Sequence, residues 1–411
     1  MVYLDYSATT PVNKEVLESF NKACLDFPGN PNSLHRLGTS GKKLIDDATE
    51  QIKKILNTNK EVIYTSGSSE SNNTVIKGIA SRYKNRGKHI ITSPFEHSSI
   101  IAPLNYLMDN EGFKVDIVNL DENGMVDLNH LKSLMTDDTI LVTIASVNSE
   151  LGLLQPIPEI AKIVKEYPKC YFHSDMTQSV GKVNVCMDDV DFVSFSAHKF
   201  FGLKGIGCLL KNENIVIDPL IHGGKSTTTY RSGTPALPLI VSLAKALRLA
   251  YTDFDTKYNH VLELNKYLKE NLSKYSKVYI NSNDKSIPHV LNISVIGVKP
   301  ETMLHALEEY DIFISTQSAC SSGSTKSMAV YNLTHDEARA ESSVRISISA
   351  ITTKEAIDYF LAQKVLRKFD QLNIAQIRDE IDGFIKYLDT SVGKGKMKEC
   401  IEFLERLKKS V

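Results

Sequence analysis

Ser194-Phe195-Ser196-Ala197-His198-Lys199 joins a short apolar run, residues 190–195, to a glycine-bearing segment, residues 200–207. This pattern is typical of a buried strand that ends in a turn. It places a lysine at the mouth of a sheet, with a hydroxyl and an imidazole within three residues. A partly desolvated lysine can react with a carbonyl as a neutral amine, and the hydroxyl and imidazole can hold an anion beside it. Taken alone, the six residues favour the alternative of a surface lysine after a strand.

Strand-like and helix-like segments alternate on both sides of this stretch. The runs predicted to be strands begin at Glu61, His89, Lys114, Ile140, Cys170, Val190 and Ile206. Helical periodicity lies between most of them, for example over residues 98–108, 127–135 and 157–166, and it also precedes the first strand over residues 39–56. This order predicts an α/β fold with a mostly parallel central sheet covered by helices on both faces.

Polar side chains follow these strands where each one ends. They are Ser68 and Ser69, His97, Asn148, Asp175 and Gln178, and Ser196, His198 and Lys199. Ligands of open α/β sheets bind outside the carboxyl ends of the strands. The sequence therefore predicts one binding site at this rim.

The segment of residues 66–73 (SGSSESNN) lies between a predicted strand and a helical run that contains Val75 and Ile76. Backbone N–H groups, hydroxyls and the helix dipole can together bind a phosphate at such a place. A nucleotide P-loop is excluded because the Gly-Lys-Ser/Thr signature is missing. A simple cluster of N-capping serines explains the same residues equally well.

Composition narrows the function classes. The chain has 411 residues, 42% hydrophobic and 24% charged, with a formal net charge of −1. Nothing in this balance indicates nucleic acid or an anionic membrane as a partner. The sequence contains no run of about 20 apolar residues, so we do not expect a membrane-spanning helix. The first six residues do not resemble a secretion signal, so we expect the protein in the cytoplasm. The six cysteines include no Cys-x-x-Cys pair, which gives no indication of a metal site.

The second half of the sequence does not continue the regular alternation of strands and helices. A long helical stretch from about residue 238 to 274 leads to short strands at 290–295, 312–315 and 343–347, with a polar loop at 316–326 and helical segments at 354–369, 374–388 and 395–409. We expect a large domain over residues 12–253. Residues 5–11 on their own read as a turn before a helix. We expect residues 1–11 to join residues 254–411 in a smaller domain that carries Cys320.

Taken together, the motifs resemble one family. They are DYSATTP at 5–11, TSGSSESN at 65–72, Glu96-His97, Asp175 with Thr177-Gln178-Ser179, SFSAHK at 194–199, RSGT at 231–234, SAC at 318–320, and Val344-Arg345. Their order and spacing resemble the cysteine desulfurases of the NifS/IscS type. These are pyridoxal 5'-phosphate (PLP) enzymes of fold type I in the class V aminotransferase family.

The resemblance implies a role for each predicted site residue. Lys199 would hold PLP covalently, Asp175 would pair with its ring nitrogen, and His97 would stack on the ring and assist proton transfer. Gln178 would donate to the phenolic oxygen. Ser68, Ser69, Ser196 and His198 would bind the phosphate, with Thr234 from a second subunit. Asn148 and Arg345 would bind the carboxylate of L-cysteine, and Cys320 would receive its sulfur as a persulfide.

The resemblance also implies a homodimer and a sulfur-acceptor protein, for iron-sulfur clusters or tRNA thiolation. The nearest alternative function is that of a selenocysteine lyase or another class V aminotransferase-like enzyme. An alternative that is not an enzyme is a non-catalytic sulfur-scaffold protein. Ser149 stands where the family usually has a second asparagine, and Gln317 where glycine is common. Residues 390–411 lie in the helical tail, which we interpret as a docking surface for the acceptor.

Overall fold

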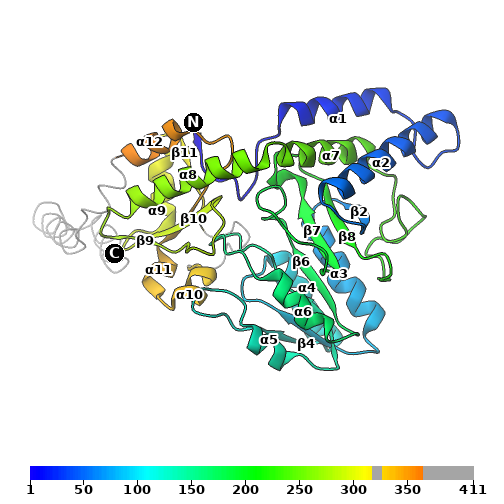
Figure 1. Cartoon of the computed structure of the whole chain (residues 1–411), viewed down its shortest axis with the longest axis horizontal. Helices are drawn as coiled ribbons and strands as arrows, with labels where there is room; N and C mark the ends of the chain where they lie inside the picture. Colours follow the sequence, from blue (N-terminus) through cyan, green and yellow to red (C-terminus); the bar gives the residue numbers. More distant parts are fainter. Residues whose placement is uncertain (317–325, 364–411) are drawn as a thin grey trace, which may run out of the picture.

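The computed structural model describes residues 1–316 and 326–363 of the chain (Figure 1). The loop that carries Cys320 and the helical segments predicted at 374–388 and 395–409 lie outside the described residues. In the described part, two bodies are built around separate sheets.

The larger body contains a seven-stranded sheet with the order β2-β8-β7-β6-β5-β3-β4. Its strands are β2 (Glu61–Thr65), β3 (His89–Thr92), β4 (Lys114–Ile117), β5 (Thr139–Thr143), β6 (Tyr171–Asp175), β7 (Phe192–Ser196) and β8 (Gly207–Lys211). β8 is antiparallel to both of its neighbours, and the pairs among β3 to β7 are parallel. The mostly parallel α/β sheet predicted from the sequence is confirmed.

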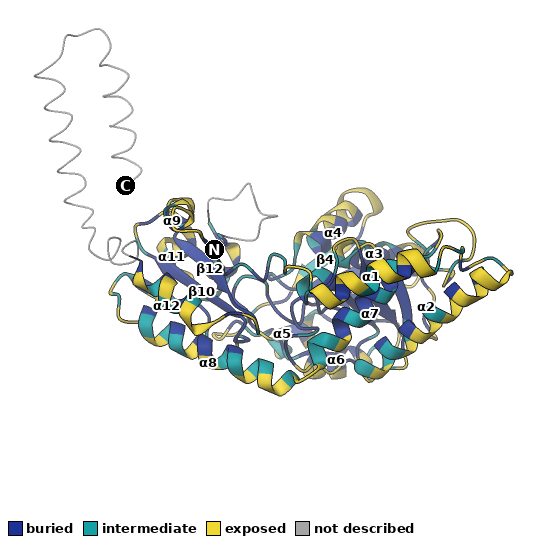
Figure 2. Ribbon diagram, turned by 90° about the horizontal axis from the view of Figure 1, so that it is seen from above, coloured by how far each residue is buried: buried dark blue, intermediate teal, exposed yellow. Residues whose placement is uncertain are grey.

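Helices cover both faces of this sheet. Their bounds are α1 (Lys14–Asp26), α2 (Arg36–Ile55), α3 (Ser68–Tyr83), α4 (Ser98–Glu111), α5 (Leu128–Leu134), α6 (Ile157–Lys165) and α7 (Leu237–Tyr251). One apolar core includes buried residues of α1, α2, α6 and α7, and a second includes buried residues of α3 and α4. Figure 2 shows exposed residues on the outer sides of the helices and buried residues in the strands.

The helical run predicted from 238 to 274 is two helices, so that prediction was wrong. α7 ends at Tyr251 and α8 (Phe254–Leu272) begins three residues later. Asp253 lies between them with φ of 52°, a left-handed conformation that interrupts the helical hydrogen bonds. The break lets α7 pack on the large sheet while α8 continues to the second body (Figure 1).

The smaller body has an antiparallel sheet of β9 (Val278–Ile280), β10 (Val290–Val295) and β12 (Ser343–Ser347) in the order β12-β10-β9. The other elements are α9 (Pro300–Glu308), α10 (Met328–Thr334), α11 (Glu337–Glu341) and α12 (Lys354–Ala362). β1 (Val2–Tyr3) pairs in parallel with β11 (Ile312–Phe313), which brings the first residues of the chain into this body. No helix of the described residues is long and apolar enough to cross a membrane.

Candidate functional site

A polar cavity of about 560 Å³ lies at the carboxyl ends of the large sheet's strands, beside β12 of the smaller body. The structure brings most of the predicted site residues to its wall: Ser68, Ser69, His97, Asp175, Gln178, Ser196, His198, Lys199 and Arg345. Two lysines (Lys199 and Lys204), one arginine, one carboxylate and several hydroxyls therefore line the same space.

One corner of the cavity has the features of a phosphate site. The Ser196 hydroxyl accepts a hydrogen bond from Ser68 N at 2.7 Å and lies 3.0 Å from Ser68 Oγ. α3 begins at Ser68, and its N-cap residue, Gly67, has no side chain that could cap the helix. A Cβ on Gly207 would lie 2.6 Å from Gly67 Cα, so β8 can approach this turn only with a glycine there. Hydroxyls and the positive end of a helix together favour an anion at this corner.

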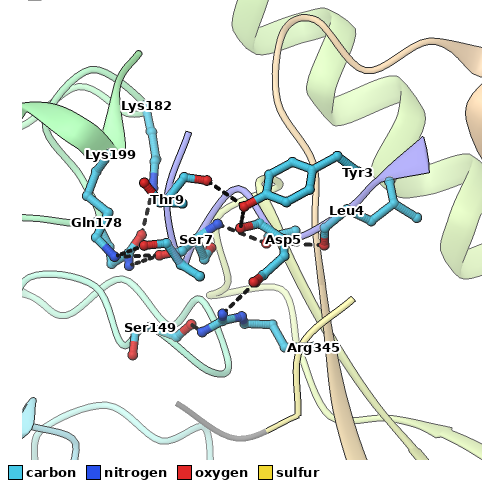
Figure 3. Close-up of polar contacts among 12 residues, drawn as sticks. Tyr3, Leu4, Asp5, Ser7, Thr9, Ser149, Gln178, Lys182, Lys199 and Arg345 are labelled. Atoms are coloured by element: carbon cyan, nitrogen blue, oxygen red, sulfur yellow. Dashed lines mark hydrogen bonds and ion pairs between the residues drawn. The ribbon is translucent and has the colours of Figure 1, made fainter. Parts of the chain in front are cut away.

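Lys199 follows β7 in a short 3-10 turn and reaches the N-terminal segment of the chain. Its Nζ donates to the carbonyls of Ser7 at 2.7 Å and Ala8 at 2.8 Å. Gln178 Nε2 donates to the same Ser7 oxygen at 3.0 Å (Figure 3). Residues 5–11, which read locally as a turn before a helix, thus contribute Ser7, Ala8 and Thr9 to the wall of the site.

Asp175 ends β6 and has both carboxylate oxygens hydrogen-bonded. Oδ1 accepts from Thr177 N at 2.9 Å, and Oδ2 accepts from Asn72 Nδ2 at 2.8 Å. The carboxylate is buried at 8% exposure, which fixes its direction toward the cavity that it lines. Such a fixed, partnered carboxylate is suited to pair with a protonated ring nitrogen.

The two histidines of the site are held neutral by their surroundings. Burial lowers the pKa of His97; Lys199 lowers it further, and Asp175 opposes both. Burial, reinforced by Lys199, lowers the pKa of His198 to about 4. Both imidazoles therefore serve as uncharged hydrogen-bonding groups at neutral pH.

Arg345 reaches the cavity from β12 of the smaller body. Its Nη2 donates to Asp5 Oδ1 at 2.8 Å and its Nη1 to Ser149 O at 3.0 Å (Figure 3). Its Nε is buried and has no partner among the described residues. Asp5 and Ser149 therefore hold both terminal nitrogens of the guanidinium, and each of these nitrogens has a second N–H that a carboxylate can accept.

Two predicted site residues are not brought to this cavity, and the position of a third is not described. Asn148 is absent from its wall; its Oδ1 accepts from the backbone of Glu150 and Leu151, and its Nδ2 donates to Phe95 O. Thr234 is exposed and also absent from the wall. Cys320 lies outside the described residues. Their predicted roles stay predictions.

Sequence reasoning missed the side chains that support the wall. Asp5 holds Arg345, Asn72 holds Asp175, and Lys182 Nζ donates to Gln178 Oε1 at 2.6 Å. Asp5 belongs to the motif DYSATTP and Asn72 to the motif TSGSSESN, but neither residue lies at the end of a strand. Gln178 and Lys182 are four positions apart, a spacing at which side chains on one helical turn contact each other, and this spacing could have predicted their hydrogen bond.

Comparison with known proteins agrees with the geometry. The sequence model of the family Aminotransferase class-V matches residues 2–360. The chain belongs to the class V aminotransferases. Members of this family depend on PLP.

Curated relatives of this class V enzyme are cysteine desulfurases. Cysteine desulfurase IscS of Dictyoglomus turgidum is 39% identical over 366 residues, covering 88% of this chain and 92% of the relative. The mitochondrial cysteine desulfurase of Saccharomyces cerevisiae is 37% identical, covering 87% of this chain and 73% of the relative. A solved NifS-like protein matches with a TM-score of 0.84 and 33% identity, covering 90% of this chain and all of that one. Within the class V family, the chain therefore belongs to the cysteine desulfurases.

The residues of this cavity fit the cofactor of the family. A phosphate corner, a fixed carboxylate and a lysine amine all line one space, as a phosphorylated pyridine aldehyde requires. Within the described residues, no three His, Cys, Asp or Glu side chains gather to hold a metal ion.

Proposed function

We propose that this chain is a PLP-dependent cysteine desulfurase that converts L-cysteine to L-alanine and moves the sulfur to Cys320. The observation that carries the proposal is that Lys199 and Arg345, from different bodies, line one cavity. An amine for the cofactor and a guanidinium for a carboxylate define a site for an amino acid.

The cofactor would be held by groups that already face the cavity. Its phosphate would lie with Ser68, Ser69, Ser196 and His198, and Thr234 of the partner subunit would join them in a homodimer. Asp175 would pair with the ring nitrogen, Gln178 Nε2 would donate to the phenolic oxygen, and Lys199 would bind the aldehyde carbon. When bound, PLP supplies an electron sink for the α-carbon of the amino acid.

The chain's own residues would orient the substrate and move its protons. Arg345 would bind the carboxylate of L-cysteine through paired N–H groups. Lys199 Nζ, next to the cavity, would take up the α-proton, and His97 would assist proton transfer. Asn148, although not on the cavity wall, is proposed to help Arg345 through the turn that carries Ser149, since its side chain fixes that turn.

The sulfur would leave on Cys320. Its thiolate attacks the substrate sulfur, so that an S–S bond forms while the bond between Cβ and sulfur breaks. The carbon product takes up a proton and leaves as alanine. The persulfide would then pass to an acceptor protein for iron-sulfur cluster assembly or tRNA thiolation, in the cytoplasm, with residues 390–411 as the docking segment.

The test is turnover of the full-length protein with L-cysteine and a reductant, with alanine and sulfide measured together. Lys199→Ala should lose the visible absorption band of the bound cofactor and both products. Cys320→Ala should lose alanine release while retaining the band. Cys186→Ala, which removes an exposed thiol that does not line the cavity, is the control and should retain both.

The same experiment separates the alternatives. An aminotransferase-like enzyme would retain its activity in Cys320→Ala, and a selenocysteine lyase would release alanine from L-selenocysteine only. A non-catalytic scaffold would show neither the band nor turnover. Any of these results would overturn the proposed function.

A further inference from the structure

A continuous chain of hydrogen bonds links two cavity residues from separate elements, Asp175 and His97. Asn72 Nδ2 donates to Asp175 Oδ2 at 2.8 Å and to Ser99 Oγ at 2.9 Å. Ser99 Oγ lies 2.8 Å from His97 Nδ1. Asn72 is fully buried and Ser99 is 9% exposed, so water does not compete for these contacts.

The donors in this chain lead outward from Asn72, to Asp175 on one side and toward Ser99 and His97 on the other. The Asn72 amide supplies N–H groups to both neighbours, so Ser99 Oγ accepts from it and can direct its own proton to His97 Nδ1. The backbone N–H of Ser99 also donates to Nδ1, at 3.1 Å, because His97 caps the start of α4. A ring nitrogen that accepts two hydrogen bonds carries no proton, so the proton of the neutral imidazole is on Nε2.

We propose that Ser99 and Asn72 are positioning residues that fix His97 as the tautomer protonated on Nε2 and tie its ring to the carboxylate of Asp175. The inference rests on the proposed function, in which His97 and Asp175 contact the cofactor from different sides. It assigns the proton of His97 to one atom: Nε2 is the nitrogen that donates toward the cavity.

Burial and Lys199 favour a neutral His97 ring, and Asp175 opposes them. Asp175 and Lys199 face it from the ends of β6 and β7, and Glu96 precedes it in the chain. Protonation of Nδ1 would set its N–H against the backbone N–H of Ser99. That conflict adds to the effect of burial, which already lowers the pKa of His97.

Nitrogen-15 NMR of the full-length chain with labelled histidine tests the tautomer directly, with and without PLP. The His97 signals are identified by their loss in His97→Asn. In the wild type, Nδ1 should resonate as an unprotonated acceptor and Nε2 as protonated. Ser99→Ala should raise the pKa of His97, since the neutral form loses a donor, and Ser99→Thr should restore it. Ser98→Ala, at the exposed neighbouring position, is the control and should titrate as the wild type.

Cofactor affinity gives a second measurement on the same variants. Ser99→Ala should weaken PLP binding about 5-fold, the effect of one neutral hydrogen bond, and Ser99→Thr should regain it. A wild-type ring protonated on Nδ1, or a Ser99→Ala variant that titrates as the wild type, would overturn the proposal. Because the tautomer is read without the cofactor as well, failure of the proposed function would leave this result interpretable.

Discussion

Asp5 and Arg345 are 340 positions apart in the chain, yet Asp5 Oδ1 accepts a hydrogen bond from Arg345 Nη2 at 2.8 Å. The backbone on both sides of Asp5 is fixed to the strand of Arg345. Ser347 N donates to Leu4 O at 2.7 Å, and Ser7 N donates to Ser347 Oγ at 2.9 Å. Asp5 is therefore a fixed support that sets the plane of the guanidinium.

Removal of this support should impair recognition of the substrate carboxylate. We expect Asp5→Ala to raise KM for L-cysteine about 10-fold, because a charge-assisted hydrogen bond is worth about 1.5–3 kcal/mol, with a smaller effect on kcat. Asp5→Asn, which keeps an acceptor, should show a smaller increase. Steady-state kinetics measure both; a lower KM in Asp5→Ala would mean that Asp5 competes with the substrate.

Lys182 should act through Gln178. Its Nζ donates to Gln178 Oε1 at 2.6 Å, which turns Nε2 toward Ser7 O and the cavity. We expect Lys182→Met to weaken PLP binding about 5–10-fold, since the amide is then free to flip. When Gln178→Ala is already present, Lys182→Met should cause almost no further loss of PLP affinity. Equilibrium PLP binding of the wild type, the two single variants and the double variant gives the coupling energy. Additive effects would contradict this role.

Glu96 should make the stability of the fold dependent on pH. Its Oε1 accepts from Ser93 Oγ and Ala145 N, while Oε2 is buried without a partner among the described residues. Burial raises the pKa of Glu96 from 4.5 to about 8. The folded protein thus binds this proton more tightly than the unfolded chain does.

The stability from Glu96 is fully present below pH 4.5 and is lost as the pH rises through about 8. Glu96→Gln keeps the acceptor and cannot ionise, so it should remove this dependence. Relative to the variant, the wild type should lose on the order of 3 kcal/mol of unfolding free energy between pH 5 and pH 8.5. Urea unfolding at both values measures the difference, and parallel curves for the two proteins would count against the assignment.

Lys211 is a buried cation that holds the segment after β8. It is fully buried, pairs with Glu61 Oε2 at 2.9 Å, and donates to the carbonyls of Asn212 at 3.0 Å and Ile215 at 2.8 Å. Lys211→Met should destabilise the fold by about 2–4 kcal/mol, since these acceptors lose their donor in a buried place. The surface pair of Lys114 with Asp116 provides the control, Lys114→Met, with an expected cost of at most about 1 kcal/mol. Equal costs from chemical denaturation would refute this account.

The sequence predicted the groups of the site well because their positions follow from local rules. Asp175, Lys199 and Ser196 lie at or just after strand ends, and parallel strands bring those ends to one rim. The break between α7 and α8 was missed, because the apolar periodicity continues through Asp253. The helix ends through the extended backbone of Thr252 and the left-handed backbone of Asp253.

The contribution of residues 5–10 could not be derived from local pattern. Their hydrogen-bond partners include Lys199, His198 and Arg345, each more than 180 positions away, and no periodicity encodes such pairs. The Asn72–Ser99 contact joins two helices, and it too depends on how α3 and α4 pack. The division between residues 253 and 254 stays a prediction.

Within residues 1–316 and 326–363, the chain passes between the two bodies twice, once from α7 to α8 and once near residue 10. Val2 and Tyr3 add a strand to β11, whereas the Thr10 hydroxyl donates to His198 O beside the large sheet. A gene split at residue 253 would therefore leave a complete site in neither fragment. Co-expression of the two halves would have to rebuild it, with the opening decapeptide reaching from one polypeptide onto the other.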